Sequence, residues 1–254
     1  MEIIITNGAK ELGQAAGHAA ATLIRKAIAE KGSANIILAT GTSQFETLSQ
    51  LISEPGIDWS KVVMFHLDEY IGLPSTAKAS FRNYLQERFI DKIPSLKAAH
   101  LINGENNAEA ECKRLGDLIR KHPVDVALVG IGENCHLAFN DPPADFVTEQ
   151  PYIIVSLDKT CRRQQLGEGW FNTFADVPKQ AITMSINQIV KSKHIICSVP
   201  DSRKAMPVKN ALEQAVSDLY PASILQLHAN CTFYLDTSSA ALLSQSIISK
   251  TTSQ

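Results

Sequence analysis

The residues best suited to proton transfer lie in the stretch GIGENCHLAFNDP, residues 130–142. His136 can act as a general acid or base near neutral pH, with its protonation set by a neighbouring carboxylate such as Asp141. No second histidine and no cysteine cluster lies near enough in the sequence to complete a metal site, so we expect no metal. A lone histidine beside apolar residues is more often structural, and on this stretch alone both interpretations stay open.

The two glycines of this stretch, Gly130 and Gly132, do not make a dinucleotide fingerprint. The third glycine position of that motif holds Cys135, and the stretch is not the first strand-to-helix turn of the chain. We therefore expect no nicotinamide or flavin cofactor.

A second acid–base candidate is the pair Asp68-Glu69, which ends the apolar run VVMFHL, residues 62–67. Consecutive strand residues point to opposite faces, so only one of the two should face a given pocket. A strand-end carboxylate can serve as a general base where dehydration raises its pKa. A solvated acidic turn is the alternative that these two residues leave open.

A phosphate site is predicted where Thr40-Gly41-Thr42-Ser43 follows the apolar run NIILA and precedes a helix. The backbone N–H groups and hydroxyls of such a turn can hold a phosphate at the helix N-terminus. Lys204, at the start of a later helix, could add a positive charge to the same phosphate. The alternatives are an ordinary helix cap and a solvated lysine.

The elements that must position these residues alternate along the chain. Apolar runs rich in β-branched residues predict strands at 3–6, 35–40, 62–67, 125–131, 152–157, 181–186, 194–199 and 231–236. Helical apolar spacing predicts helices at 12–31, 43–52, 80–90, 111–122 and 203–216. Continuous apolar strands are covered on both faces, which favours a three-layer α/β/α fold with a mostly parallel, doubly wound, Rossmann-like sheet. Ligands of such sheets bind at the carboxyl ends of the strands, where all the candidates above fall.

Length and charge set the remaining expectations. A chain of 254 residues favours one domain over 1–254, and a net charge of −2 argues against nucleic acid and membrane partners. Five widely spaced cysteines suit no disulfide framework, and the start of the chain has no secretory signal pattern, so we expect a cytoplasmic protein. The polar stretches 141–151 and 158–169 are predicted to be long loops, with a lid within roughly 142–175.

Taken in order, five segments resemble the glucosamine-6-phosphate deaminase family, which is related to the 6-phosphogluconolactonases. The segments are ATGTS (39–43), FHLDEYIGLP (65–74), GIGENCHLAFNDP (130–142), AITMSI (181–186), and SRKA (202–205) followed by PASILQLH (221–228). The resemblance runs over roughly residues 30 to 240, and the ending Phe-Asn-acid-Pro favours the deaminase branch over the lactonases.

This resemblance implies a hexosamine 6-phosphate as the small-molecule substrate, either the glucosamine or the galactosamine epimer. The implied reaction combines aldose–ketose isomerisation with loss of ammonia, passes through an enolamine, and needs no metal or organic cofactor. Family members range from monomer to hexamer, so a homo-oligomer is allowed.

The resemblance also assigns roles to individual residues. Asp68 matches the base that moves the C2 proton, and His136 matches the residue that opens the sugar ring. Asp141 falls where the family has a glutamate that supports this histidine. Thr42 and Ser43 match the phosphate loop.

Two further residues follow from the same resemblance. Lys204 matches a phosphate-contacting lysine. Arg163 is the residue that we expect to replace a phosphate-binding arginine of the family's lid, with its neighbour Arg162 as the alternative.

The chain departs from the family around the histidine. Asn134 stands where the family has an aspartate; it can accept a hydrogen bond from the imidazole but carries no charge. Cys135 stands where the family prefers glycine, so a positive φ there would cost energy.

Two other functions therefore stay open. One is lactone hydrolysis, with His136 activating water. The other is a sugar-phosphate-binding protein whose ring-opening chemistry is impaired by Asn134 and Asp141.

Overall fold

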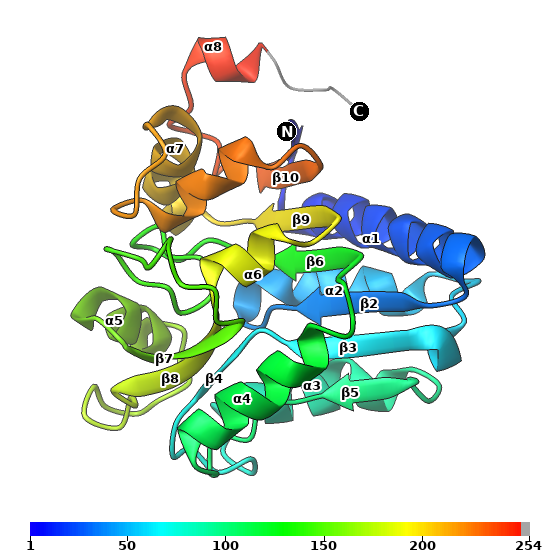
Figure 1. Cartoon of the computed structure of the whole chain (residues 1–254). Helices are drawn as coiled ribbons and strands as arrows, with labels where there is room; N and C mark the ends of the chain where they lie inside the picture. Colours follow the sequence, from blue (N-terminus) through cyan, green and yellow to red (C-terminus); the bar gives the residue numbers. More distant parts are fainter. Residues whose placement is uncertain (250–254) are drawn as a thin grey trace.

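A central sheet of seven parallel strands organises the computed structural model, which describes residues 1–249 (Figure 1). Its strands are β1 (Glu2–Thr6), β2 (Ala34–Leu38), β3 (Val62–His66), β5 (Ala98–His100), β6 (Val126–Val129), β9 (His194–Val199) and β10 (Cys231–Asp236). Their order across the sheet is β1-β10-β9-β6-β2-β3-β5, and every neighbouring pair is parallel. The predicted α/β fold with a mostly parallel sheet is confirmed.

Helices cover both faces of this sheet. One face carries α1 (Ala9–Lys31), α2 (Phe45–Ser53) and α3 (Phe81–Arg88), and the other carries α4 (Ala108–Ile119), α6 (Ile186–Val190) and α7 (Ala205–Glu213). Successive residues of β2 alternate between the two cores, with Ile36 and Leu38 on the α1 side and Ile37 on the α4 side. Burial on both sides is the reason that the strands are continuously apolar.

Several short elements complete the described chain. The single-turn and 3₁₀ segments are η1 (Thr42–Gln44), η2 (Trp59–Lys61), η3 (Ile90–Lys92), η4 (Ser202–Lys204) and η5 (Pro221–Leu227), and a last helix is α8 (Gln245–Ile248). Among residues 1–249, no helix combines the length and apolar character that crossing a bilayer requires.

A second, antiparallel sheet differs from the prediction. It contains β4 (Asp68–Tyr70), β8 (Gln180–Met184) and β7 (Tyr152–Ser156), in the order β4-β8-β7. The runs at 152–157 and 181–186 are therefore strands, as predicted, but they lie outside the central sheet. An apolar run indicates that a strand is buried; it does not indicate which sheet the strand joins.

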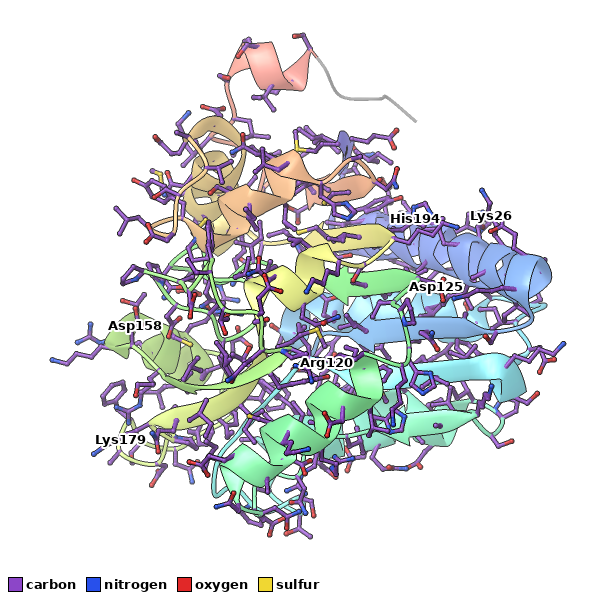
Figure 2. All side chains as sticks on the ribbon, in the orientation of Figure 1. Lys26, Arg120, Asp125, Asp158, Lys179 and His194 are labelled. Atoms are coloured by element: carbon purple, nitrogen blue, oxygen red, sulfur yellow. The ribbon has the colours of Figure 1, made fainter. Side chains whose placement is uncertain are left out.

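The stretch predicted as a loop at 158–169 is mostly a helix, α5 (Lys159–Gly167), so this prediction was wrong. Asp158, labelled in Figure 2, caps the helix because its carboxylate accepts a hydrogen bond from the backbone N–H of Cys161. The face that α5 buries includes Gln164 and Gln165 in addition to Cys161. A polar buried face has no apolar periodicity, which explains why the sequence pattern missed this helix.

Candidate active site

Loops from the carboxyl ends of four central strands meet around one cavity. Among its lining residues are six that the sequence predicted for the site: Thr40, Gly41, Ser43, Asp68, His136 and Lys204. Residues of α5 line the cavity as well. The volume of this cavity is about 60 Å³, room for roughly four to six water molecules. The cavity is partly open to solvent, so a larger ligand such as a hexose phosphate can extend out of it.

Asp68 lies at this cavity because β3 ends before Leu67 and the chain then enters β4, which begins at Asp68. Its side chain is buried, and no hydrogen bond reaches its carboxylate from any residue of the described chain. Burial, with a smaller contribution from the charge of Glu69, raises the pKa of Asp68 to about 8. A carboxyl group with this pKa can both take up and release a proton near neutral pH.

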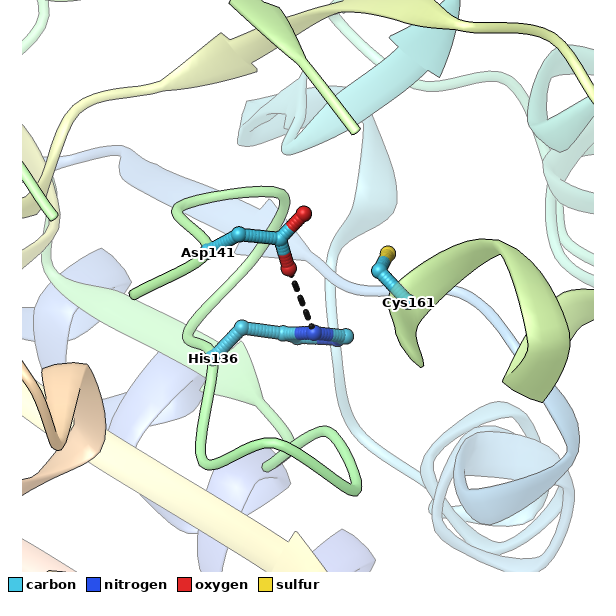
Figure 3. Close-up of side chains that lie close together, drawn as sticks. All are labelled: His136, Asp141 and Cys161. Carbon is cyan, nitrogen blue, oxygen red and sulfur yellow. Dashed lines mark ion pairs between the residues drawn. The ribbon is translucent and has the colours of Figure 1, made fainter. Parts of the chain in front are cut away.

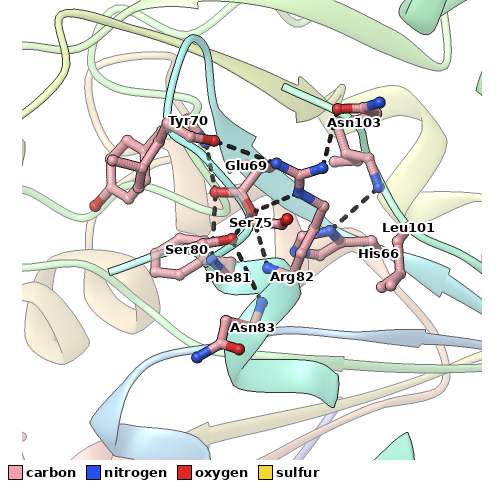
Figure 4. A network of polar contacts seen from close by, with 12 residues as sticks. His66, Glu69, Tyr70, Ser75, Ser80, Phe81, Arg82, Asn83, Leu101 and Asn103 are labelled. Carbon is pink, nitrogen blue, oxygen red and sulfur yellow. Dashed lines mark hydrogen bonds and ion pairs between the residues drawn. The ribbon is translucent and has the colours of Figure 1, made fainter. Parts of the chain in front are cut away.

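Glu69 points away from the cavity, as the alternation of strand residues predicted. Its carboxylate accepts hydrogen bonds from the backbone N–H groups of Tyr70, Phe81 and Arg82 and from the Ser80 hydroxyl (Figure 4). The N–H groups of Phe81 and Arg82 belong to the first turn of α3, where helix N–H groups lack partners within the helix. Glu69 therefore fixes β4 to α3 and holds the neighbouring Asp68 in place.

His136 and Asp141 form a close pair beside the cavity (Figure 3). His136 Nδ1 lies 3.1 Å from Asp141 Oδ1, and both side chains are almost fully buried. The other edge of the imidazole lies against Gly132, where a Cβ atom would overlap ring atoms Nε2 and Cε1. The second glycine of the stretch is therefore needed to make room for the histidine.

The tight turn that presents His136 has unusual backbone conformations. Gly132 N–H donates to the His136 carbonyl, and Cys135 N–H donates to the Gly132 carbonyl, each at 3.0 Å. Cys135 has φ 68° and Ala138 has φ 54°. Both angles fall in the left-handed region, which costs energy for residues other than glycine. Cys135 therefore carries the energetic cost that we expected for a positive φ at this position, and Ala138 carries a similar cost that no sequence signal indicated.

Asn134 accepts no hydrogen bond from the imidazole, which corrects our prediction. Its amide nitrogen donates to Asp141 Oδ1 at 2.9 Å and to Asp158 Oδ2 at 3.1 Å, and its oxygen accepts from the His136 backbone N–H. Burial by itself raises the pKa of Asp141, but the contacts from His136, Asn134 and the Asp158 backbone N–H outweigh it, so the pKa is lowered. Asp141 therefore remains an anion beside the histidine.

The cavity also contains a group that is suited to bind an anion. Lys204 is buried, and none of the described residues forms a hydrogen bond or ion pair with its ammonium group. Burial lowers its pKa, although the nearby charges of Glu168 and Glu133 oppose this effect. A buried ammonium group without a partner is costly, and an incoming anion would relieve that cost.

Thr42 faces a neighbouring outer cavity of about 430 Å³, which Ser43 and Lys204 also line. Arg203 lies on the rim of this outer cavity, where it pairs with Asp201 at 2.8 Å. The sequence did not lead us to predict Arg203 as a residue of this region, although it directly precedes the predicted phosphate-binding Lys204.

The arginine pair of α5 does not reach the cavity. Arg163 is exposed and is absent from the cavity wall. The guanidinium group of Arg162 donates to the carbonyls of Val177 and Phe174 and lies over the Phe174 ring. In place of an arginine, α5 presents Gln164, Gln165 and the following Glu168 to the cavity.

One group of possible metal ligands lies in the described chain, at His136, Asp141 and Cys161, with ligand atoms within 4.8 Å of one another. Burial raises the pKa of the Cys161 thiol well above its ordinary value, so the sulfur keeps its proton and is a poor ligand. The Nδ1 atom of His136 already faces the Asp141 carboxylate. The arrangement fits an acid–base pair better than a metal site.

Comparison with known proteins gives consistent matches over almost the whole chain. A family model described as glucosamine-6-phosphate isomerases/6-phosphogluconolactonase matches residues 7–234. Glucosamine-6-phosphate deaminase of Bacillus thuringiensis (strain Al Hakam) is 35% identical over 248 residues, which cover 97% of this chain and 91% of that protein.

Solved structures agree with this match. A monomeric glucosamine-6-phosphate deaminase of the NagB superfamily is 32% identical with a TM-score of 0.85, covering 95% of this chain and all of the other. The 6-phosphogluconolactonase of Trypanosoma brucei has a TM-score of 0.77 at 17% identity, over 96% of this chain and 98% of that one, which indicates a shared fold.

Proposed function

The chain belongs to the glucosamine-6-phosphate isomerase/6-phosphogluconolactonase family, and we propose that it is a hexosamine-6-phosphate deaminase. One observation carries the proposal: the same cavity is lined by a buried carboxyl group with a raised pKa, by a histidine that is paired with a carboxylate behind it, and by a buried lysine without a partner among the described residues. These groups match three demands of an amino-sugar phosphate: proton transfer at carbon, ring opening and phosphate binding.

Ring opening is assigned to His136. Its imidazole passes a proton between the anomeric hydroxyl and the ring oxygen, which converts the pyranose to the open aldehyde. Asp141, held as an anion, stabilises the imidazole while it carries the extra proton.

Asp68 then acts on the open chain. Its carboxylate removes the C2 proton to give an enolamine, and the same group returns the proton to C1. Water adds at C2 to the resulting iminium group, and ammonia leaves. The products are one ketose 6-phosphate and one ammonia for each amino-sugar phosphate and water consumed.

The phosphate is assigned to the part of the cavity that Lys204 lines. The turn from Thr40 to Ser43 supplies backbone N–H groups and hydroxyls, and Gly41 has φ 94°, which only glycine adopts without strain. Both the glucosamine and the galactosamine epimers fit this proposal, since they differ at C4, away from the three assigned groups.

We also propose a cytoplasmic location. All five cysteines have free thiols, which is usual in a reducing compartment.

Lactone hydrolysis is the second candidate, because the same fold occurs in the Trypanosoma brucei lactonase. Hydrolysis needs a base to activate water and has no use for proton transfer at C2. A buried Asp68 with a raised pKa favours the deaminase.

The test is a substrate panel with two readouts. Glucosamine 6-phosphate and galactosamine 6-phosphate are assayed for ammonia and ketose phosphate, and 6-phosphogluconolactone is assayed for acid release. We expect ammonia from at least one amino sugar. Acid release without ammonia would establish the lactonase, and thermal stabilisation by the amino sugars without turnover would establish a binding protein.

A further inference from the structure

Helix α5 supplies a polar side chain to the cavity that the proposed chemistry does not use. Gln165 is buried, with 5% of its surface exposed, and lines the same cavity as Asp68 and His136. Amide groups at buried positions are expensive unless they have a partner or a ligand to bind.

The orientation of this amide is fixed by Tyr70. The Tyr70 hydroxyl donates to Gln165 Oε1 at 2.9 Å. Tyr70 is fully buried, and its ring packs against Phe81, Phe139 and Phe171 with centroid distances of 5.1, 5.2 and 5.5 Å. A side chain held by three aromatic contacts has little freedom to move, so the amide of Gln165 is preorganised.

The amide nitrogen of Gln165 forms no hydrogen bond with any described residue. No described residue accepts a hydrogen bond from Gln165 Nε2, in contrast to the neighbouring Gln164. Gln164 Oε1 accepts from the Glu133 backbone N–H, and its Nε2 donates to Glu168, each at 2.8 Å. Gln164 is therefore satisfied within the protein, and Gln165 retains a free donor at the cavity.

The position of Tyr70 indicates which part of a substrate Gln165 would meet. Tyr70 is two residues after Asp68 in β4, so the two side chains leave the strand on the same face. The bond from the Tyr70 hydroxyl thus places Gln165 on the side of the cavity that Asp68 lines, and Lys204 reaches the cavity from a different element, η4 after β9. With C2 at Asp68, the ring oxygen at His136 and the phosphate at Lys204, the part of a hexosamine phosphate left for α5 is its C3–C4 edge.

We propose that Gln165 is a specificity-determining residue whose Nε2 donates a hydrogen bond to a hydroxyl on the C3–C4 edge of the substrate. This inference rests on the proposed function, because it takes the orientation of the sugar from the roles of Asp68, His136 and Lys204. Tyr70 is a positioning residue in this arrangement, since it holds the amide and does not touch the sugar.

The test combines protein variants with substrate analogues. Steady-state kcat/KM is measured for the wild type, Gln165→Leu and Gln165→Glu, with the preferred amino-sugar phosphate and with its 3-deoxy and 4-deoxy analogues. Both replacements keep the approximate size of the side chain, and neither leucine nor an ionised glutamate can donate the hydrogen bond. For the natural substrate we expect kcat/KM to fall about 10- to 100-fold in both variants.

The decisive result is the comparison across analogues. Wild type should discriminate against one deoxy analogue, and the variants should treat that analogue and the natural substrate almost equally. Tyr70→Phe should give a smaller loss in the same direction. Thr160→Ala, an exposed position on the same helix, is the matched control and should behave as wild type.

Two failures can be told apart. If wild type releases no ammonia from any amino sugar, the proposed function fails. If wild type is active and the Gln165 variants, verified as folded by circular dichroism, keep its discrimination against the deoxy analogues, then the role of Gln165 alone is refuted. The Glu variant preserves the test should the Leu variant not fold.

Discussion

Replacing Asp68 by asparagine should make the protein more stable at alkaline pH while it removes the deaminase activity. Burial, and secondarily the charge of Glu69, raises the pKa of Asp68 from 3.8 to about 8. Between these two values the folded protein keeps a proton that the unfolded chain has lost. The stabilising contribution of this group is therefore complete below about pH 4 and is lost as the pH rises toward 8.

The size of the effect follows from the two pKa values. At 1.36 kcal/mol per tenfold change in proton affinity, wild type should lose about 4 kcal/mol of unfolding free energy between pH 5 and pH 8 through this group. The asparagine variant cannot titrate there and escapes this loss. Relative to wild type, its unfolding free energy should rise by about the same 4 kcal/mol over that pH range.

Urea denaturation of both proteins at pH 5 and pH 8 measures this difference. Asp91→Asn, at an exposed position, is the matched control and should follow wild type at both pH values. In parallel, the kcat/KM of wild type should rise with pH toward 8 as Asp68 becomes the carboxylate, and the variant should lose about 10²- to 10⁴-fold in rate. An equal stability difference at pH 5 and pH 8 would refute the raised pKa, and full activity in the variant would refute the role as base.

Three further predictions concern the groups around Asp68. In Gly132→Ala, the new methyl group must displace the His136 ring, so kcat should fall about 100-fold or more while circular dichroism stays unchanged; unchanged kcat would mean that the ring position is not critical. In Lys204→Gln, loss of the buried cation should raise KM for the phosphorylated substrate about 10- to 100-fold in steady-state kinetics, and the exposed control Lys191→Gln should leave KM as it is. In Glu69→Gln, the amide nitrogen cannot accept the hydrogen bonds that the carboxylate now receives, so unfolding free energy in urea should drop by about 2–4 kcal/mol; a variant as stable as wild type would contradict this account of the β4–α3 junction.

The part of the site that could be predicted from the sequence is the part set by strand ends. Asp68, His136 and the turn beginning at Thr40 each follow an apolar run, and parallel strands bring their carboxyl ends to one edge of the sheet. Each apolar run and the residues that follow it can be recognised from a short stretch of sequence. Convergence at one cavity then follows from the topology, without knowledge of any side-chain contact.

The contribution of α5 to the cavity could not be predicted in this way. Helix α5 buries amide groups at Gln164 and Gln165, and periodicity methods detect only apolar burial. One of the two hydrogen-bond partners of Asn134 was equally hidden, because Asp158 lies 24 residues further along the chain. Such contacts depend on how α5 packs over the loop, which no local spacing reveals.

Asp68 and Asp141 have contrasting surroundings, which supports distinct roles for them. The surroundings of Asp141 also answer the question of whether Asn134 impairs ring opening. Asp141 receives hydrogen bonds from Asn134 and the Asp158 backbone N–H in addition to its contact with His136, so it stays ionised. Asp68 receives none from the described residues and titrates near neutral pH. Two carboxyl groups whose pKa values are pushed apart by their surroundings are typical of an acid–base site. An aspartate at 134 would face Asp141 and Asp158 and repel both, whereas the asparagine amide donates to each. The imidazole therefore keeps its carboxylate, and the departure from the family pattern is compatible with ring opening.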